Sequence, residues 1–140
     1  MTSRLGILLI DDDPIFRLTT TKILQTAYAG QLDITTFQNG QEALEYFNAP
    51  SANFHLVFLD LNMPFLDGWD LLKAMQQMPL FTNEPHRHHV YILSSSTSLS
   101  DQEQARSFPV LKGYLVKPVT KEQLAHTIDA YFEDQKKSVY

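Results

Sequence analysis

The sequence contains no cysteine, which fits a reducing compartment. No apolar run approaches the roughly 20 residues of a membrane span, and the apolar stretch in MTSRLGILLIDDD is too short for a signal peptide. The formal net charge is -5, and the 11 Lys and Arg residues are scattered, which argues against a nucleic-acid surface. At 140 residues the chain is about one domain long. We therefore expect a cytoplasmic, single-domain protein that binds neither membranes nor nucleic acids.

Five short apolar runs predict β-strands. They are LGILLI (Leu5–Ile10), DITTF (Asp33–Phe37), HLVFLDL (His55–Leu61), VYILS (Val90–Ser94) and GYLV (Gly113–Val116). The first, third and fourth runs are nearly continuous in apolar residues, which is typical of strands buried on both faces. These three runs therefore form the expected centre of a parallel sheet.

Segments with helical spacing lie between and after these runs. Their periodic positions are Phe16, Thr20, Ile23, Leu24 and Ala27; Ala43, Leu44 and Phe47; Leu71, Leu72, Met75 and Met78; and Leu124, Ile128, Tyr131 and Phe132. The segment Ser100–Phe108 has few apolar residues and meets Pro109, which predicts a short helix. Strict alternation of strand and helix predicts a doubly wound α/β domain with five parallel strands and five helices on both faces of the sheet.

Chemically active side chains follow the ends of these strands. Asp11 and Asp12 end the first strand, Asp60 lies at the end of the third, Ser94 ends the fourth and Lys117 follows the fifth. Ligands of doubly wound sheets bind outside the carboxyl ends of the strands, where the winding reverses. The five positions are therefore expected along one edge.

The residue types at this edge suggest phosphoryl chemistry. Carboxylates that lie close together repel one another unless a cation compensates, and oxygen ligands with a phosphate are how Mg²⁺ is usually held. Asp60 would then act as a nucleophile on phosphorus. Lys117 would supply a second cation, and the Ser94 hydroxyl would hydrogen-bond a phosphoryl oxygen.

The third aspartate of LLIDDDP has a different predicted role. Asp13 precedes Pro14, and an acid before Pro at the first helical position is typical of an N-cap. Capping pairs are also predicted at Thr120 with Gln123 and at Asn39 with Glu42. Asp67 and Gly68 predict an ordinary turn with a cap.

Four motifs together resemble the receiver domain of two-component response regulators. They are ILLIDDDP, VFLDLNMPFLDG, YILSSS and GYLVKP, and the resemblance runs from about Leu5 to Phe132. It implies a flavodoxin-like sheet of strand order 2-1-3-4-5. It also implies that Asp60 is the phosphoacceptor, that Asp11 and Asp12 position Mg²⁺, and that Asn62 gives the metal its backbone carbonyl.

The resemblance further implies a switch. Ser94 matches the switch hydroxyl, Tyr114 the switch aromatic and Lys117 the lysine of the site, followed by a cis bond to Pro118. Asn62 and Ser96 match positions that tune dephosphorylation. The output face would be formed by the fourth helix, fifth strand and fifth helix, from about Ser100 to Phe132.

The implied partners are a histidine kinase or histidine phosphotransfer protein as phosphodonor and a downstream protein as target. We expect a single receiver domain over residues 1–140, with a core of about 5–132, a tail at 133–140 and no output domain, as in stand-alone receivers. Such a protein is a regulator and not an enzyme. It promotes only its own phosphorylation and slow dephosphorylation.

Two other functions remain as alternatives. The first is a degenerate receiver-fold binding module that works without phosphorylation, against which the complete set of acidic, hydroxyl and lysine residues argues. The second is a flavodoxin-like cofactor binder or a haloacid-type phosphatase. No phosphate loop rich in Ser, Thr or Gly follows the first strand, and DDDP is not a DxD pattern led by a nucleophile.

The segment PHRHH carries His86, His88 and His89, which raises a transition-metal site or a phosphohistidine relay as hypotheses. Zinc sites usually need four ligands at definite spacing, and the chain offers no Cys or matched second His pair. We therefore expect an exposed loop.

Overall fold

The computed structural model describes residues 4–84 and 87–138 of the chain. Five parallel strands form one sheet in the order β2-β1-β3-β4-β5, as the resemblance implied. The strands are β1 (Leu5–Ile10), β2 (Leu32–Phe37), β3 (Leu56–Asp60), β4 (His89–Ser94) and β5 (Leu111–Val116). The central strands β1, β3 and β4 are buried along their whole length, which explains their continuous apolar runs.

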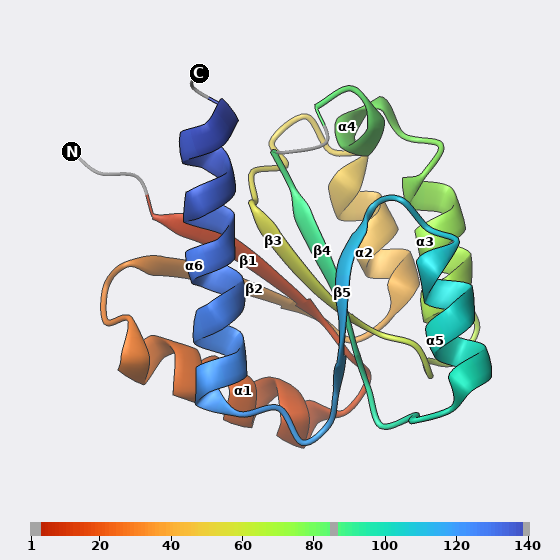
Figure 1. Ribbon diagram of the computed structural model, residues 1–140, viewed down its shortest axis with the longest axis horizontal. Helices are drawn as coiled ribbons and strands as arrows, with labels where there is room; N and C mark the ends of the chain where they lie inside the picture. The colour runs from red at the N-terminus through yellow and green to blue at the C-terminus, as the bar shows by residue number, and fades with distance from the viewer. Residues whose placement is uncertain (1–3, 85–86, 139–140) are drawn as a thin grey trace.

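Six helices connect or follow the strands in the described part of the chain. They are α1 (Pro14–Ala27), α2 (Gly40–Phe47), α3 (Gly68–Met75), α4 (Pro79–Thr82), α5 (Leu99–Arg106) and α6 (Lys121–Ser138). Helices α1 and α6 cover one face of the sheet, and α2, α3 and α5 cover the other (Figure 1). The short helix α5 ends before Pro109, as predicted.

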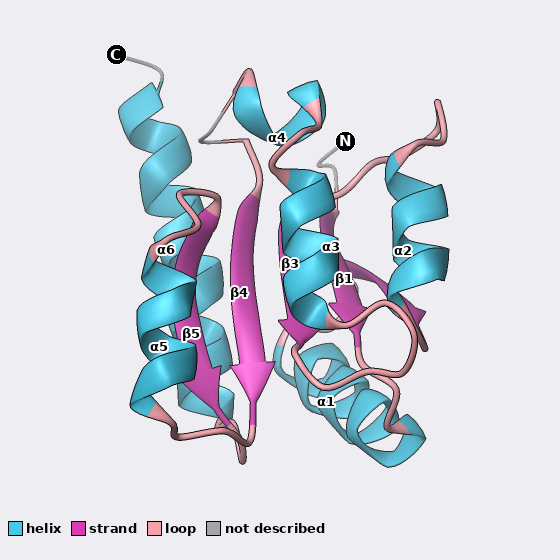
Figure 2. Ribbon diagram, turned by 90° about the vertical axis from the view of Figure 1, so that its right-hand side faces the viewer, coloured by secondary structure: helices cyan, strands magenta, loops and turns pink. Residues whose placement is uncertain are grey.

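Alternate residues of β1 enter two separate cores. Leu8 and Ile10 belong to the core beneath α2 and α3, whereas Ile7 and Leu9 belong to the core beneath α1 and α6. This alternation is the period of two that a strand imposes on its side chains. The arrowheads of the parallel strands lie together at one end of the sheet (Figure 2).

The helix starts follow the predicted capping chemistry. Asp13 accepts a hydrogen bond from the backbone N–H of Ile15, at 2.9 Å, and Pro14 opens α1. Asn39 caps α2 and Asp67 caps α3. The Thr120 hydroxyl accepts from the N–H of Gln123 at 3.1 Å. Local sequence therefore determines where these helices begin.

The prediction of five helices was wrong by one short helix. Helix α4 lies in the segment after α3, at the end of the sheet opposite the strand arrowheads (Figure 2). Pro79 opens this single turn, and the turn buries Phe81 against the rings of Phe47, Phe54 and His88. The segment between α3 and β4 thus adds an aromatic side chain to the core.

The expectation of an exposed histidine loop was wrong for His88 and His89. Their side chains are buried, with residue exposures of 6% and 3%, and His89 begins β4. The Nε2 atom of His89 lies 2.8 Å from a carboxylate oxygen of Asp134. His86 lies outside the described residues.

The predicted tail at 133–140 was also wrong in its first part, since α6 continues to Ser138. Asp134 lies in this extension, and its contact with buried His89 ties the helix to the start of β4. One helical turn earlier, the Tyr131 hydroxyl donates to the carbonyl of Arg87 at 3.1 Å. These two contacts hold the end of α6 to the sheet.

Candidate functional site

Three carboxylates meet at the carboxyl end of the sheet. Asp11 and Asp12 follow β1, and Asp60 is the last residue of β3, the neighbouring strand. One carboxylate oxygen from each residue lies within 4.8 Å of the others. The parallel sheet therefore brings together the acidic groups that the sequence separates by about fifty residues, as predicted.

The three carboxylates differ in their exposure to solvent. Asp11 and Asp60 are 1% and 6% exposed, whereas Asp12 is open to solvent. Burial and the neighbouring charge of Asp11 raise the pKa of Asp60 from its ordinary 3.8 to about 6. Lys117 opposes this rise in pKa. Asp60 is therefore largely ionised near neutral pH, although its surroundings disfavour the negative charge.

Lys117 supplies the positive charge of the cluster. Its Nζ atom donates to Asp11 Oδ2 at 2.6 Å and lies 3.7 Å from Asp60 Oδ1. The peptide bond between Lys117 and Pro118 is cis, as the resemblance implied. One ammonium group is thus shared unequally between two buried carboxylates.

Asp11 has partners on each of its polar oxygens. Its Oδ1 atom accepts from the N–H of Asp13 at 2.9 Å, and its carbonyl accepts from the Arg17 guanidinium at 2.6 Å. With the Lys117 contact, these bonds fix Asp11 in place. Asp12 faces solvent, so it is the more available of the pair to an incoming cation.

Ser94 and Tyr114 lie on the neighbouring strands. Asp60 pairs with Leu93 across β3 and β4, so Ser94 lies one residue beyond it at the same edge. The Ser94 hydroxyl is fully buried and accepts from the N–H of Ser96 at 3.1 Å. The Tyr114 hydroxyl, from β5, donates to the carbonyl of Ser96 at 3.0 Å. Ser96 therefore links the two predicted switch residues.

The side chain of Ser96 points to another partner. Its hydroxyl donates to Asp101 Oδ2 of α5 at 2.6 Å, and it also accepts from the N–H of Ser98 at 3.3 Å. The loop between β4 and α5 is therefore held by hydrogen bonds on both sides of Ser96. Asp101 was not predicted as part of this region.

The loop after Asp60 depends on a close approach of backbone. A Cβ atom at Gly68 would lie 2.6 Å from the Asp60 carbonyl oxygen and 2.7 Å from Leu61 Cα. The N–H of Gly68 also donates to the Leu61 carbonyl at 2.9 Å. Gly68 is therefore more than a turn residue, because it lets α3 begin against the end of β3. Asn62 lies between them and is exposed.

The donors of this cluster fit a hard divalent cation such as Mg²⁺. All three side chains offer carboxylate oxygens, the preferred ligands of that ion, and the Asn62 carbonyl lies in the adjoining loop. The cluster holds three carboxylates and one ammonium group, and this excess of negative charge adds to burial in raising the pKa of Asp60. A bound cation would relieve that excess.

The sequence did not predict two contacts that side chains of α1 make with the site. The Phe16 ring lies beneath the Lys117 ammonium, 4.1 Å from ring centroid to Nζ, and the Arg17 guanidinium bonds the Asp11 carbonyl. A cap at Asp13 fixes where α1 starts and hence which side chains of its first turn face the acidic cluster. The cap could be found in the sequence, and with it the position of Phe16 on α1. The contact between Phe16 and Lys117 could not, because the two residues are about a hundred positions apart.

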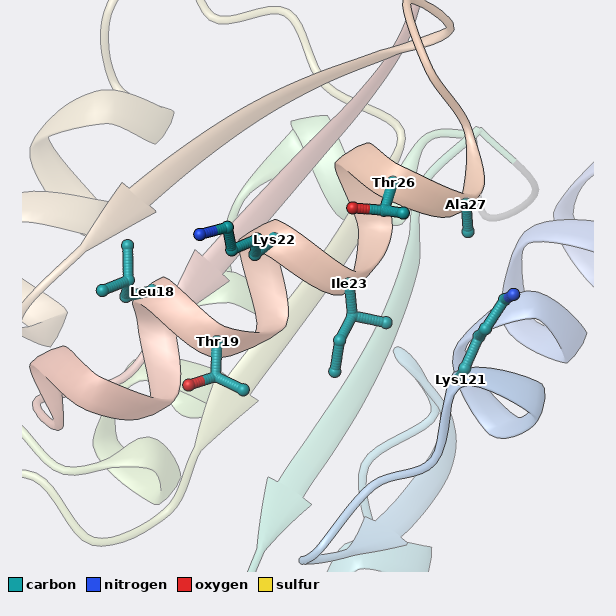
Figure 3. A pocket seen from close by; sticks show the side chains of 7 residues that line it. All are labelled: Leu18, Thr19, Lys22, Ile23, Thr26, Ala27 and Lys121. Atoms are coloured by element: carbon teal, nitrogen blue, oxygen red, sulfur yellow. The ribbon is translucent and has the colours of Figure 1, made fainter.

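A separate hollow of about 440 Å³ lies along α1 and reaches the start of α6. Figure 3 shows its lining, with most residues on α1 and one lysine on α6: Leu18, Thr19, Lys22, Ile23, Thr26, Ala27 and Lys121. None of the predicted site residues lines it. The hollow is mainly apolar and holds no carboxylate, so it is not the site of the chemistry described above.

Comparisons with known proteins identify the family of this chain. The sequence profile of the response regulator receiver domain matches residues 7–129. The chain belongs to this family. As a receiver domain of two-component signalling, it has relatives that share its length and others that are much longer.

Three relatives show this range. The receiver is 32% identical over 133 residues to 3′,5′-cyclic-nucleotide phosphodiesterase regA of Dictyostelium discoideum, covering 94% of this chain but only 16% of that protein. It is 29% identical to two-component response regulator ARR22 of Arabidopsis thaliana, covering 92% of this chain and 84% of the relative. It is 31% identical to protein PilG of Pseudomonas aeruginosa, with 91% and 87% covered.

Solved structures show the same fold. A two-component response regulator from Cytophaga hutchinsonii superposes with a TM-score of 0.79 at 26% identity, covering 94% of this receiver and 99% of that chain. Chemotaxis protein CheY4 of Vibrio cholerae gives a TM-score of 0.72 at 28% identity, with 92% and 99% covered. Within residues 4–84 and 87–138, no helix is long and apolar enough to cross a bilayer.

Proposed function

We propose that this receiver is a phosphorylation-dependent signalling switch and that Asp60 is its phosphoacceptor. The observation that carries the proposal is the acidic cluster itself: Asp60 shares the Lys117 ammonium with Asp11, and the Asp12 carboxylate is the third acidic group at the same edge of the sheet. A buried excess of negative charge that costs stability is expected where charge is needed for chemistry. The family membership supports the same conclusion.

The proposed reaction transfers a phosphoryl group between side chains. A carboxylate oxygen of Asp60 forms a bond to phosphorus while the P–N bond of a phosphohistidine breaks, and the imidazole of the donor leaves with that electron pair. The donor would be a histidine kinase or a histidine phosphotransfer protein. With a pKa of about 6, Asp60 is mainly ionised at neutral pH and is therefore available as the nucleophile.

The surrounding groups have complementary roles in this proposal. Lys117, 3.7 Å from Asp60, would exchange its Asp11 contact for a phosphoryl oxygen. The buried Ser94 hydroxyl would donate a hydrogen bond to another phosphoryl oxygen. Its hydrogen is available for this bond because the hydroxyl only accepts in its contact with the N–H of Ser96. Such positioned positive charges and donors stabilise the transferring group.

The carboxylates would also hold Mg²⁺. Asp11, Asp12 and Asp60 would supply side-chain oxygens, and Asn62 would supply its backbone carbonyl. When bound, the ion neutralises charge on the phosphoryl oxygens. Of Asp11 and Asp12, Asp12 is the more available for direct contact because it is exposed, whereas both carboxylate oxygens of Asp11 already accept hydrogen bonds that the ion would have to replace.

Ser96 would transmit the conformational change from Ser94 to Tyr114. Movement of Ser94 toward a phosphoryl group would shift the N–H of Ser96 and with it the carbonyl that holds the Tyr114 hydroxyl. Tyr114 lines a hollow of about 310 Å³ between α5 and β5, together with Arg106 and Lys112. A downstream protein that binds the face of α5, β5 and α6 would thereby sense the state of Asp60.

The lifetime of the phosphoryl group would be set by side chains near the attacking water. Asn62 is exposed beside Asp60, and Ser96 follows the switch hydroxyl. The Ser96 hydroxyl is held by Asp101 at 2.6 Å and is therefore directed toward α5 in this state. We propose that these two residues tune dephosphorylation, and that the receiver acts as a regulator without a substrate of its own.

Intact mass spectrometry tests the proposal. The protein is incubated with Mg²⁺ and a small phosphodonor such as acetyl phosphate. We expect the mass of one phosphoryl group to be added, in an acid-stable and base-labile form. The adduct should be absent from Asp60→Asn and present in Asp70→Asn, a control on the first turn of nearby α3.

The opposite result has a clear meaning. If the wild-type protein gains no mass, and beryllofluoride leaves its spectrum unchanged, the chain is a receiver-fold binding module that works without phosphorylation. If Asp60→Asn still gains one phosphoryl group, another residue is the acceptor. Either outcome would reject Asp60 as the phosphoacceptor.

A further inference from the structure

The ammonium group of Lys117 has an aromatic partner in addition to its two carboxylates. Its Nζ atom lies over the face of the Phe16 ring, 4.1 Å from the ring centroid. A cation within about 6 Å of an aromatic centroid is attracted by the negative face of the ring. The Lys117 side chain is only 18% exposed, so water screens this attraction incompletely.

The position of the ring is fixed independently of the lysine. Phe16 lies in the first turn of α1, three residues after the Asp13 cap and two after Pro14. It is partly buried and packs against the core beneath α1 and α6, which contains Leu24 and Leu124. The core therefore holds the ring, and the ring offers a rigid surface to a long, flexible side chain.

The three partners of Lys117 behave differently during the proposed phosphorylation. The contacts with Asp11, at 2.6 Å, and Asp60, at 3.7 Å, both involve carboxylates whose charge a cation or a phosphoryl group would change. The Phe16 ring carries no net charge for a cation or a phosphoryl group to change. Its attraction for the ammonium therefore persists when the carboxylate contacts change.

We propose that Phe16 is a positioning residue that keeps the Lys117 ammonium beside Asp60 while its carboxylate partners change. This inference rests on the proposed function, since it assigns Lys117 to the transferring phosphoryl group. Lysine side chains lose rotamer freedom when they are fixed. A ring that restricts Lys117 beforehand reduces that loss without forming a salt bridge that a phosphoryl oxygen would have to break.

The contact is tested first without metal or phosphodonor. The ring current of Phe16 should move the NMR signals of the Lys117 ε-methylene protons upfield of those of exposed lysines. Phe16→Leu should remove this shift and Phe16→Tyr should keep it. Phe132→Leu, which removes an exposed ring on α6, is the matched control and should leave it unchanged. An unshifted Lys117 signal in the wild-type protein would overturn the proposed contact.

The positioning role is tested by the rate at which acetyl phosphate and Mg²⁺ phosphorylate the protein. Replacing Phe16 with phenylalanines of increasing fluorination weakens the negative face of the ring while its shape changes little. We expect the rate to fall progressively, by about 2- to 30-fold at full fluorination, which corresponds to the usual strength of a cation–π contact. Phe16→Leu should lie at the slow end of the series, and Phe16→Tyr should retain the wild-type rate.

The results separate the two proposals. A rate that is the same across the fluorinated series, with Phe16→Leu equal to wild type, would overturn the role of Phe16 even though Asp60 is phosphorylated. A wild-type protein that takes up no phosphoryl group would overturn the proposed function, while the NMR shift of Lys117 would still report the contact. Circular dichroism of each variant identifies any loss of fold.

Discussion

Acid should destabilise this receiver through His88, which is buried far from the acidic cluster. The side chain is 6% exposed and its ring stacks on Phe54, with centroids 4.4 Å apart and an interplanar angle of 29°. Among residues 4–84 and 87–138, neither of its ring nitrogens makes a hydrogen bond of good geometry, and the nearby Phe54 backbone only partly favours the charged ring. Burial, with a further contribution from the Arg87 guanidinium, lowers the pKa of His88 from 6.5 to about 4.

The sign and size of the effect follow from this pKa. Between about pH 6.5 and about pH 4 the unfolded chain binds a proton on His88 that the folded protein does not bind. The contribution of neutral His88 to stability is therefore full above this window and is lost as the pH falls through it. A difference of about 2.5 pKa units corresponds to about 3 kcal/mol, of which about 2 kcal/mol should be lost by pH 5.

Protonation of Asp60 has the opposite effect on stability and would mask the loss due to His88. Its pKa is raised in the folded protein to about 6, from 3.8. The folded protein therefore binds a proton on Asp60 before the unfolded chain does, and this proton uptake stabilises the fold as the pH falls. The two effects are of similar size, so the prediction is best measured in an Asp60→Asn background.

Urea unfolding at about pH 7.5 and about pH 5 provides the measurement. We expect Asp60→Asn to lose about 2 kcal/mol more stability over this interval than the double variant Asp60→Asn, His88→Phe. Phenylalanine keeps a ring against Phe54 but has no group to protonate. If both proteins lose the same stability, His88 does not bind protons differently in the folded and unfolded states, and the argument from its burial is refuted.

Three further predictions concern the site and the end of α6. Lys117→Met should raise the pKa of Asp60 above about 6 in the metal-free protein, measured by carboxyl ¹³C NMR titration, because the ammonium charge lowers it; an unchanged pKa would contradict this. Gly68→Ala should lower the free energy of unfolding in urea by about 1 to 3 kcal/mol, since its Cβ would lie 2.6 Å from the Asp60 carbonyl; a value within error of wild type would disprove the close approach. Asp134→Ala should cost about 1 to 3 kcal/mol through loss of its contact with His89 and should increase hydrogen exchange in the last turns of α6, whereas unchanged exchange would show that other contacts hold this helix.

Much of the fold follows from local sequence. Continuous apolar runs identified the buried strands β1, β3 and β4, and the caps at Asp13, Asn39 and Asp67 marked helix starts that the structure confirms. These features depend on residues only a few positions apart. The strand order came from the resemblance to a family, because periodicity alone does not state which strands are neighbours.

The candidate site was predictable in its members but not in its internal contacts. The positions at strand ends placed Asp11, Asp12, Asp60, Ser94 and Lys117 at one edge of the sheet, where the structure has them. That edge position follows from chain direction in a parallel sheet, which the sequence pattern already implies. Their functional roles remain proposals.

Only the tertiary structure decided how these side chains are paired. It shows that Lys117 lies closer to Asp11 than to Asp60 and that Phe16 lies beneath it. It also buries His88 and His89 where an exposed loop was expected. A local pattern shows which side chains lie on each face of a segment. The burial of those side chains and their contact partners depend on segments far away in the sequence, as for His89 with Asp134 and Lys117 with Asp11. The sequence by itself determined the central strands, most of the helix starts and which polar residues lie at one edge of the sheet, and three-dimensional packing determined which of their charged groups are paired.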